Sequence, residues 1–539
     1  MKPPQKRIAI LFFYAAAFLC AVARAQSLDT IGVTLLRAVT TNLNGSGIPV
    51  GQAEASQSIS DPTQWEINPS AFGVGLPTNL FTYFVSPTPG YTSVNSTNIY
   101  PNSLGSESGH AELVAGFFYG VPNGVATNVA HADNYEANTF INYYVAGGHP
   151  ISERIVNQSF SFGPLATNDQ ESVDSDYDNY SAQHGTLFVS AANNADNSAT
   201  VCAPGTSYDC ISVGAYLNSV NYSSTGPTPD NGRCKPDITA PADETSTSTP
   251  QVAGAAAVLL QAGLRGDGGS TNSAADIRTL KALLLNGAVK PDDWTNSNSS
   301  PLDARYGAGV LNIFNSYEQL TGGKHGFNYS TNIPAGTIHP PAAVTNSIAA
   351  LSGWDFNTNT SSTLNDAVSH YFFNLTNATT NAFFTATATL VWNRHQNKTG
   401  INNLDLFLYN CASSNLVACS TSLVDNVEHI FIPKLAQGRY DLQVWKAAGT
   451  PGVTVVSSSE IYALAWEFFS PTASVAKSGA NLSLSWPVYP AGFVVEATTN
   501  LISTAWSTNS IPSPVVTNNQ NSILLSATNA NQFFRLRRP

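Results

Sequence analysis

The chain has little charge, little sulfur and few basic groups. Of its 539 residues, 11% are Asp, Glu, Lys or Arg, six are cysteine and one is methionine. Its 23 basic side chains are outnumbered by 35 acidic ones, so the formal net charge is -12. This balance argues against nucleic acid or an anionic membrane as the main partner, because both carry negative charge. No Cys-x-x-Cys spacing or His-rich pair occurs, so the sequence does not indicate zinc.

Long hydrophobic runs are also absent, except at the N-terminus. Residues 8–22 form an apolar stretch of signal-peptide length, between a basic segment and the small-residue motif Ala23-Arg-Ala25. This arrangement predicts a secretory signal peptide over residues 1–25, with the mature chain beginning at Gln26. An N-terminal membrane anchor is the alternative, although the run is short for a span. We therefore expect a secreted, extracellular protein, or one in the periplasm or on the outer surface, with no membrane span.

Five cysteines would remain after removal of this segment. In an oxidising compartment we expect Cys411 and Cys419 to pair across a hairpin. Cys202 could pair with Cys210 and leave Cys234 over, or Cys234 could take one of them. The spacing does not decide between these connectivities.

An α/β pattern extends over residues 26–320. Apolar β-type runs alternate there with helical patterns rich in small residues. The predicted strands include 154–159 and 185–191, and the predicted helices include 112–118, 250–263 and 273–287. Alternation of this kind predicts a parallel sheet with helices on both faces.

Helical periodicity disappears after about residue 321, and alternating strands replace it. Residues 321–470 predict a β-sandwich, and residues 471–539 predict a smaller β-sandwich module. The strands that carry these predictions are 383–392, 404–409, 440–445 and 462–466, and then 482–486, 492–496, 522–526 and 532–536. The Pro-, Gly- and Asn-rich stretch Gly322–Pro341 is expected to be a linker.

One motif presents a candidate nucleophile. Glu244-Thr-Ser-Thr-Ser-Thr-Pro-Gln-Val-Ala-Gly254 places a hydroxyl group four residues before a proline and a helix of small residues. Proline is tolerated in the first turn of a helix, and the positive end of the helix dipole favours a nearby anion. The motif resembles Gly-Thr-Ser-Met-Ala-Thr-Pro-His-Val-Ala-Gly of the subtilisin-like serine peptidases. The resemblance implies a subtilisin-like three-layer catalytic domain with Ser246 as nucleophile; a loop with a helix cap is the plainer alternative.

The triad of that family follows the order acid, His, Ser. Gly109-His-Ala-Glu-Leu-Val-Ala-Gly116 resembles the family's His-Gly-Thr-His-Val-Ala-Gly and implies that His110 is the general base. Gly45-Ser-Gly-Ile-Pro-Val-Gly-Gln-Ala-Glu-Ala55 resembles the family's first strand and places Glu54 where the family has Asp. Asp61 and Asp29 are weaker candidates for the acid. Sedolisins also use Glu on this fold, but in place of the His, so His110 favours the subtilisin branch.

Further motifs of the family follow in the expected order. Gly185-Thr-Leu-Phe-Val-Ser-Ala-Ala-Asn-Asn194 resembles the segment with the oxyanion-binding amide, which implies Asn194 or, with a shift of one residue, Asn193. Val156-Asn-Gln-Ser159 resembles the strand that pairs with substrate and implies contacts at Ser159, Phe160 and Ser161. Two other segments with similar resemblance are 235–241 and 306–312.

The resemblance predicts a secreted serine endopeptidase that hydrolyses peptide bonds of a protein or peptide substrate through an acyl-enzyme. The alternative is an inactive subtilisin fold used as a binding scaffold, because Glu54 replaces Asp and Glu244 replaces Gly. No cofactor is expected to be required. Family members often bind structural calcium, but no site is placed here, and the calcium-loop-like stretch 174–180 is expected to be helical. The two β domains are expected to stabilise the enzyme or to contact a surface or polysaccharide.

Overall fold

The structure is a computed structural model. It describes residues 28–196, 198–337, 341, 346–377, 382–448, 455–470, 472–479, 481–500, 505–509, 511–517, 520–526 and 532–537. The predicted signal peptide lies outside the described residues. None of the helices within these ranges is both long and apolar enough to cross a bilayer.

A mixed sheet forms the centre of the N-terminal part of the chain. Its strands are β1 Pro49–Glu54, β3 Phe81–Val85, β4 Asn95–Thr97, β6 His131–Glu136, β7 Ile155–Gln158, β8 Leu187–Ala191, β9 Ile211–Leu217, β10 Val220–Asn221 and β11 Ile238–Pro241. The order is β10-β9-β8-β7-β1-β6-β3-β4, and β11 pairs with β9. The pairs from β9 through β1 to β3 are parallel, whereas β10 and β4 are antiparallel at the two edges. The carboxyl ends of the inner strands therefore share one edge of the sheet.

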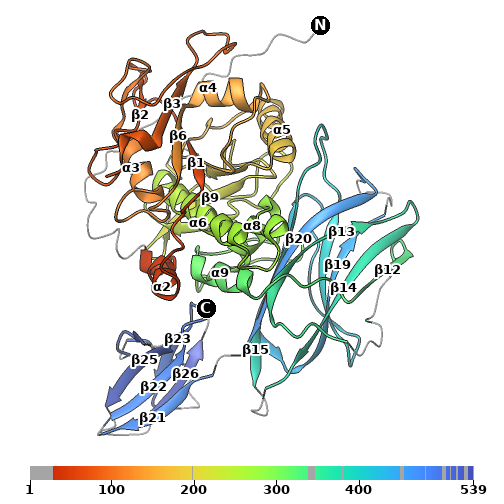
Figure 1. Ribbon diagram of the computed structural model, residues 1–539. Helices are drawn as coiled ribbons and strands as arrows, with labels where there is room; N and C mark the ends of the chain where they lie inside the picture. Colours follow the sequence, from red (N-terminus) through yellow and green to blue (C-terminus); the bar gives the residue numbers. More distant parts are fainter. Residues whose placement is uncertain are drawn as a thin grey trace.

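Helices cover both faces of this sheet (Figure 1). They are α2 Val33–Val39, α3 Gly109–Phe118, α4 Ala137–Thr139, α5 Thr167–His184, α6 Thr245–Arg265, α7 Thr271–Ala274, α8 Ile277–Asn286 and α9 Ile313–Thr321, with the short η1 Thr78–Leu80 and η2 Phe140–Val145. Alternate residues of β8 point to opposite faces: Leu187 and Val189 pack in the core of α3 and α6, and Phe188 packs with Tyr177 of α5. The predicted three-layer α/β class is confirmed; we call this part the α/β domain.

Two antiparallel sheets form a sandwich after α9. Its strands are β12 Tyr329–Pro334, β13 Ser352–Thr360, β14 Asn365–Leu375, β15 Phe383–Trp392, β16 Leu404–Asn410, β17 Leu416–Ser420, β18 Val427–Ala436, β19 Gly438–Lys446 and β20 Ser459–Phe469. The sheets have the orders β12-β14-β19-β16-β17 and β13-β20-β15-β18. Trp392, Leu442 and Trp466 are among the fully buried residues between them.

A smaller all-β unit, the C-terminal module, ends the chain. Its strands are β21 Ser474–Ser478, β22 Asn481–Pro487, β23 Val494–Thr498, β24 Val515–Thr517, β25 Gln520–Ser526 and β26 Phe533–Arg537. They form the sheets β21-β22-β25-β24 and β23-β26 around a small core that includes Leu484, Trp486 and Ile523. A minor parallel pair, β2 Gln64–Glu66 and β5 Ser106–Glu107, lies in the α/β domain.

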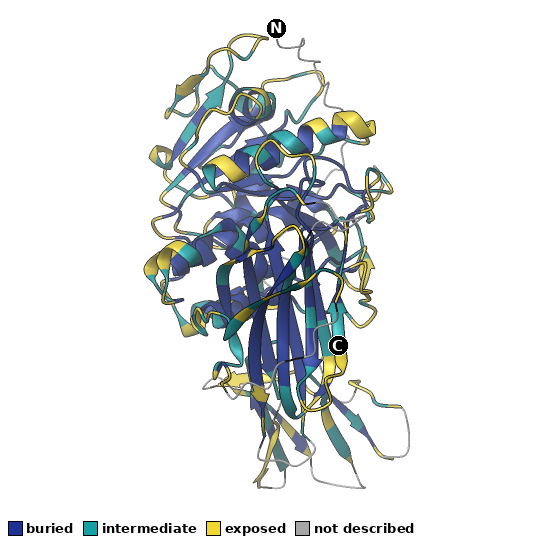
Figure 2. Ribbon diagram, turned by 90° about the vertical axis from the view of Figure 1, so that its right-hand side faces the viewer, coloured by how far each residue is buried: buried dark blue, intermediate teal, exposed yellow. Residues whose placement is uncertain are grey.

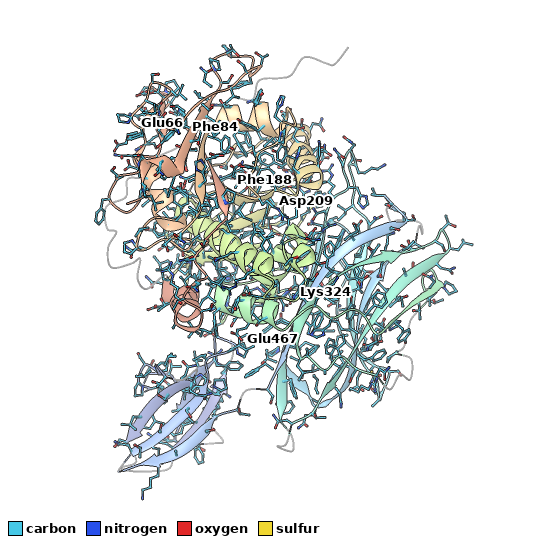
Figure 3. All side chains as sticks on the ribbon, in the orientation of Figure 1. Glu66, Phe84, Phe188, Asp209, Lys324 and Glu467 are labelled. Carbon is cyan, nitrogen blue, oxygen red and sulfur yellow. The ribbon has the colours of Figure 1, made fainter. Side chains whose placement is uncertain are left out.

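The sandwich packs directly on the α/β domain. Its strands β15 and β20 lie against α8, where Thr387 and Thr389 each donate a hydrogen bond to Oδ1 of Asn286 over 3.0 Å. Figure 2 shows that buried residues continue from the helices into these strands. Arg394 of the sandwich donates its backbone N–H to Asp209 over 2.9 Å, and Figure 3 labels Asp209 at this boundary. Sandwich residues such as Trp354 and Ala465 therefore belong to the core of the α/β domain, while the space between the two sandwich sheets holds a separate core.

The expected linker Gly322–Pro341 is wrong in its middle. Tyr329–Pro334 forms β12, which pairs with β14 from Tyr329 opposite His370 to Pro334 opposite Asn365. This strand lies at the edge of its sheet, and an edge strand tolerates proline because only one side of its backbone needs partners. Composition alone therefore suggested a linker where a strand forms.

The expected disulfides are also wrong: all five described cysteines are free thiols. Cys419 lies opposite Phe407 in the β16–β17 ladder, and Cys411 lies four residues further along. At about 3.3 Å per residue these Cα atoms are roughly 13 Å apart along the strand, whereas a disulfide needs about 7 Å or less. Cys202 and Cys210 each donate to a backbone carbonyl of their own loop, to Thr200 and Ser207 respectively.

Candidate active site

The candidate nucleophile is the second residue of α6. The helix begins at Thr245 and not at Pro250, so the predicted helix starts five residues too late. Pro250 lies in the second turn, where its missing N–H would otherwise bond to the carbonyl of Ser246. That carbonyl instead accepts a hydrogen bond from the hydroxyl of Ser159 over 3.1 Å. Proline thus frees a backbone group of the nucleophile for a contact with a neighbouring strand.

The candidate base lies at the start of α3. Ser108 caps this helix by accepting from the backbone N–H of Ala111, and His110 occupies the second position. Nδ1 of His110 lies 2.9 Å from Oε2 of Glu54, and Nε2 lies 3.0 Å from Oγ of Ser246. A carboxylate can only accept, so Nδ1 carries the proton in this arrangement and Nε2 faces the Ser246 hydroxyl as an acceptor.

The base and the acid differ in exposure. The His110 side chain is 32% exposed, whereas that of Glu54 is 1% exposed. Glu54 is the last residue of β1, so it projects from the carboxyl edge of the central sheet. The acid is therefore shielded from water, while the base stays accessible to a substrate.

The pKa of His110 lies above its usual value. Burial by itself would lower this pKa, but the charge and hydrogen bond of Glu54 and the charge of Glu244 outweigh that effect. The pKa of Glu244 is raised, chiefly by burial. The charge of His110 lowers this pKa in part, and the charges of Asp243 and Asp196 raise it further. The surrounding carboxylates therefore favour the protonated imidazole that general-base catalysis produces.

Glu54 has a second partner that the sequence did not suggest. The Nε2 of Gln52 donates to Oε1 of Glu54 over 2.8 Å and also lies 2.9 Å from the carbonyl of Ala111. The hydroxyl of Tyr119 donates to Oε1 of Gln52 over 2.7 Å. The period of two in a strand could have placed Gln52 on the face of Glu54, but no local signal points to Tyr119.

The two asparagines after β8 have different surroundings. Oδ1 of Asn194 accepts from both N–H and Oγ1 of Thr245, each over 2.8 Å. Because a backbone N–H must meet an oxygen, this contact fixes the amide orientation and leaves Nδ2 as a donor beside the nucleophile. Asn193 has a left-handed backbone, with φ 86°, and its amide lies against Cys202. The geometry thus favours Asn194 over Asn193 as the amide that faces the site.

Residues 82–309 match the model of the subtilase family. The chain carries a subtilase domain, and we use this name below for the α/β domain. The predicted resemblance is thereby confirmed, and with it the assignment to the serine peptidases of this family. The matched segment contains His110, Asn194 and Ser246 and begins after Glu54.

Three solved structures are similar to this chain. The self-cleaved protease domain of PatA is 20% identical and covers 52% of this chain and 100% of its own, with a TM-score of 0.35. A cold adapted subtilisin-like serine proteinase is 20% identical and covers 50% of this chain and 90% of its own, with a TM-score of 0.32. The PatG macrocyclase in complex with peptide is 15% identical and covers 54% and 97%, with a TM-score of 0.39.

The predicted substrate-binding residues continue β7 of the subtilase domain. Ser159 is buried, with Nδ2 of Asn157 donating to its hydroxyl over 3.0 Å. Phe160 is also buried and meets Phe162 edge to face at 6.3 Å between ring centres, whereas Ser161 is half-buried. This segment therefore begins beside the nucleophile, because the hydroxyl of Ser159 donates to the carbonyl of Ser246.

The other candidates lie away from this centre. Asp61 accepts from N–H and Oγ1 of Thr63 in a surface turn, and Asp29 is exposed near α2. The calcium-like stretch 174–180 lies within α5, where Asp174 pairs with Arg233 over 3.0 Å. In the part of the chain that the structure describes, no group of three or more His, Cys, Asp or Glu is placed to hold a metal ion.

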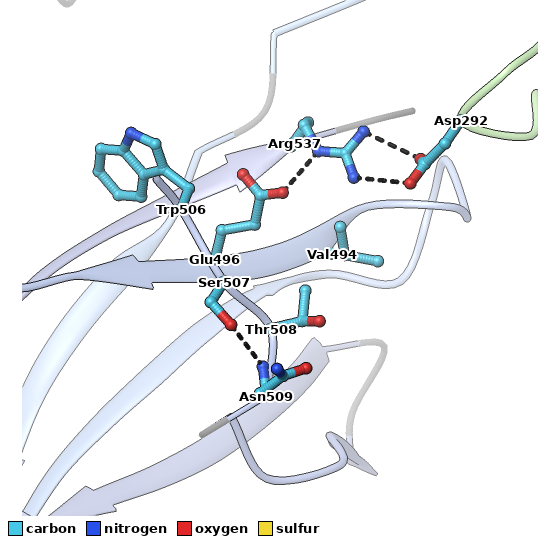
Figure 4. A pocket seen from close by; sticks show the side chains of 8 residues that line it. All are labelled: Asp292, Val494, Glu496, Trp506, Ser507, Thr508, Asn509 and Arg537. Carbon is cyan, nitrogen blue, oxygen red and sulfur yellow. Dashed lines mark hydrogen bonds and ion pairs between the residues drawn. The ribbon is translucent and has the colours of Figure 1, made fainter. Parts of the chain in front are cut away.

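The C-terminal module carries a pocket that no triad residue lines, and Figure 4 shows the side chains that do line it. Trp506, Glu496 and Arg537 line it together with Asp292 of the subtilase domain. Its charges are already paired, because Glu496 accepts from Arg537 over 2.7 Å and Arg537 also bonds to Asp292 over 3.0 Å. This pocket therefore offers no unsatisfied charged group for a ligand.

Proposed function

We propose that this protein is a secreted serine endopeptidase that cleaves peptide bonds with a Glu54-His110-Ser246 triad. The observation that carries the proposal is the unbroken pair of contacts at His110, 2.9 Å to Glu54 and 3.0 Å to Ser246. These distances lie within the reach that proton transfer requires. The family assignment supports the reaction class, and the acid, the secretion and the cleavage of internal bonds are our inference.

The proposed reaction follows the acyl-enzyme scheme. Oγ of Ser246 attacks the scissile carbonyl while its proton passes to Nε2 of His110. Nδ2 of Asn194 and the N-terminal end of α6 stabilise the negative charge on the carbonyl oxygen. His110 then donates its proton to the leaving amine, and a water molecule, activated by the same imidazole, hydrolyses the ester. Every step uses protein side chains and water; calcium would be a structural ion only.

The acid has one methylene group more than the family's Asp. Its carboxylate still reaches His110, with 2.9 Å between Oε2 and Nδ1. Glu54 is the last residue of β1, and His110 lies in the first turn of α3. Glu54 holds the imidazole in the tautomer that accepts a proton from Ser246 and stabilises the imidazolium. We therefore assign to Glu54 the role that Asp has elsewhere in the family.

The two β domains have different roles in this proposal. The sandwich is part of the folded core of the enzyme, because β15 and β20 pack on α8. The C-terminal module has a small core of its own and contacts the sandwich through Tyr489, which bonds to Glu467 over 2.7 Å, so we assign any contact with a surface or polysaccharide to this module. A sugar- or surface-binding assay with the full chain and with a chain that ends at residue 470 tests this assignment.

Reaction with a fluorophosphonate probe tests the nucleophile. We expect labelling of the full-length protein that disappears in Ser246→Ala. Ser248→Ala is the matched control, because Ser248 lies two residues further along the same helix and donates to the carbonyl of Thr245. A folded wild-type protein that does not react would favour the inactive scaffold, and equal labelling of Ser246→Ala would place the nucleophile elsewhere.

Two further measurements separate the remaining parts of the proposal. Cleavage of a peptide blocked at both ends would establish endopeptidase activity, since an exopeptidase needs a free terminus. N-terminal sequencing of protein recovered outside the producing cell should begin at Gln26. A protein that stays inside the cell with residues 1–25 attached would contradict secretion.

A further inference from the structure

The Glu54 carboxylate is buried and depends on few donors. Its side chain is 1% exposed, and its two oxygens have different partners. Oε2 meets His110, and Oε1 accepts from Gln52, whose side chain is fully buried. A buried carboxylate with an unsatisfied oxygen is costly, so the hydrogen bond from the amide of Gln52 offsets part of the cost of burying Glu54.

Tyr119 determines which end of the Gln52 amide faces Glu54. Its hydroxyl donates to Oε1 of Gln52, so Nε2 points to Glu54 and to the carbonyl of Ala111. A reversed amide would place an oxygen against the carboxylate and another against that carbonyl. Burial, followed by the charge of Glu54, raises the pKa of Tyr119 well above its usual value, so the hydroxyl stays protonated.

These contacts join β1 and α3 at two points. His110 lies at the beginning of α3 and Tyr119 directly after its end, while Glu54 and Gln52 lie two residues apart on one face of β1. Glu54 therefore contacts the first turn of the helix and Gln52 contacts the residue behind its last turn. These contacts fix the position of the helix that carries the base relative to the strand that carries the acid.

We propose that Gln52 and Tyr119 are positioning residues that make a glutamate work as the orienting acid. This inference rests on the proposed triad. A glutamate has one more rotatable bond than an aspartate, so its carboxylate can turn away from the imidazole unless its second oxygen is also held. Gln52 donates a hydrogen bond to that second oxygen, and Tyr119 keeps the amide of Gln52 in the donating orientation.

Two variants test the proposal in the full-length protein. Gln52→Met keeps the length of the side chain and removes both polar atoms, and Tyr119→Phe removes one hydroxyl. The matched control is Tyr177→Phe: Tyr177 is equally buried, and its hydroxyl accepts from Gln158 over 2.7 Å on β7, with no contact to the triad. All three variants are first shown to be folded by circular dichroism and thermal unfolding.

The main measurement is the rate of the fluorophosphonate reaction as a function of probe concentration. It gives the maximal rate and the probe concentration at half the maximal rate. We expect Gln52→Met to lower the maximal rate about 10- to 100-fold, the usual loss when an outer residue no longer orients a reactive group. Tyr119→Phe should lower it about 3- to 10-fold, the value of one hydrogen bond. The half-maximal concentration should not change, since neither residue reaches the substrate side.

A second readout does not depend on activity. The proton between Nδ1 of His110 and Glu54 should give a strongly deshielded proton NMR resonance, absent in Glu54→Ala. Gln52→Met should shift or broaden this resonance, and Tyr177→Phe should leave it unchanged. If wild type reacts and both Gln52→Met and Tyr119→Phe behave like Tyr177→Phe in both readouts, the positioning role is overturned. If wild type itself does not react, the proposed function fails instead.

Discussion

The subtilase domain buries carboxylates in two regions that balance their charge differently. At the candidate active site, Glu54 meets the imidazole of His110 and the amide of Gln52. At the contact with the sandwich, Asp178 meets the guanidinium of Arg394 over 3.3 Å. An imidazole can gain and lose a proton near neutral pH, whereas a guanidinium stays charged. The first arrangement can therefore take part in a reaction, and the second can only hold parts of the chain together.

Part of the sandwich contact is built around the guanidinium group of Arg394. The Arg394 side chain is 1% exposed, and its guanidinium pairs with Asp178 and Glu171, while its backbone N–H donates to the carboxyl group of Asp209. Nearby, Arg233 pairs with Asp174 and lies over the ring of Tyr208. Substitutions in this region should change stability, and substitutions at the triad should change the rate.

The largest expected effect is on the rate. Glu54→Ala should lower the fluorophosphonate reaction about 10⁴-fold, because the imidazole loses the group that sets its tautomer. The free energy of unfolding should change by no more than about 1–3 kcal/mol, because Nε2 of Gln52 loses one of its two acceptors and keeps the carbonyl of Ala111. Reaction rates and urea unfolding measure the two quantities. A loss of less than tenfold would show that another group orients His110.

The next effect is on stability. Arg394→Ala should lower the free energy of unfolding by about 3–5 kcal/mol, because Asp178 is left as a buried, unpaired carboxylate. The folded fraction should still react with the probe. Arg394→Lys is the control that keeps the charge, and it should lose less. A reaction rate that falls in proportion to stability would show that the two regions are not independent.

A third region should respond to pH, since its buried carboxyls face each other. Asp133 and Glu153 lie together beside Tyr135, whose hydroxyl bonds to Glu153 over 3.0 Å, and beside His131, which lies 3.0 Å from Asp133. Burial, then the hydrogen bond and charge of Glu153, raises the pKa of Asp133 to about 9. Burial lowers the pKa of His131, so this imidazole does not supply a permanent positive charge.

The direction of the change in stability with pH follows from the protons that Asp133 binds in the native and unfolded states. The native state keeps a proton on Asp133 that the unfolded chain releases above about pH 4, the ordinary value for Asp. This group's contribution to stability should therefore fall as pH rises from about 4 toward 9. Asp133→Asn should flatten that part of the dependence of the melting temperature between pH 5 and 9. A slope equal to that of wild type would contradict the shared proton.

The smallest expected effect concerns Glu244. The reaction rate should fall as pH decreases through the raised pKa of His110, because a protonated imidazole cannot accept from Ser246. Glu244→Gln removes one of the charges that raise this pKa, so the acid side of the rate profile should move to lower pH. Asp61→Asn, in a surface turn that does not contact His110, is the control and should not move it.

Much of the fold follows from local sequence patterns. The strands β7, β8, β15, β16, β19 and β20 lie where the apolar alternation predicted them. The start of α6 was missed because Pro250 suggested a first turn, whereas Thr245 begins the helix. The strand β12 was missed because its composition is typical of loops and its partner β14 comes later in the chain.

Only part of the candidate site could be predicted from the sequence. His110 and Ser246 each lie in a segment with a recognisable pattern, and Glu54 follows from its place at the end of a strand. Gln52 and Tyr119 carry no such pattern, because each is an ordinary residue of its element. Their contact depends on how α3 packs against β1, which is a property of the packed domain.

By itself, the sequence determined the α/β-then-β organisation, the order of most of the elements and the segments that hold Glu54, His110 and Ser246. These features depend on local rules of periodicity, helix capping and residue type. Only the tertiary structure decided that five cysteines stay apart, that Gln52 holds the second oxygen of Glu54, and that Arg394 meets Asp178 across 216 residues of sequence. Each of these depends on distances between segments that become neighbours only when the apolar faces of the sheet, the helices and the sandwich pack against one another.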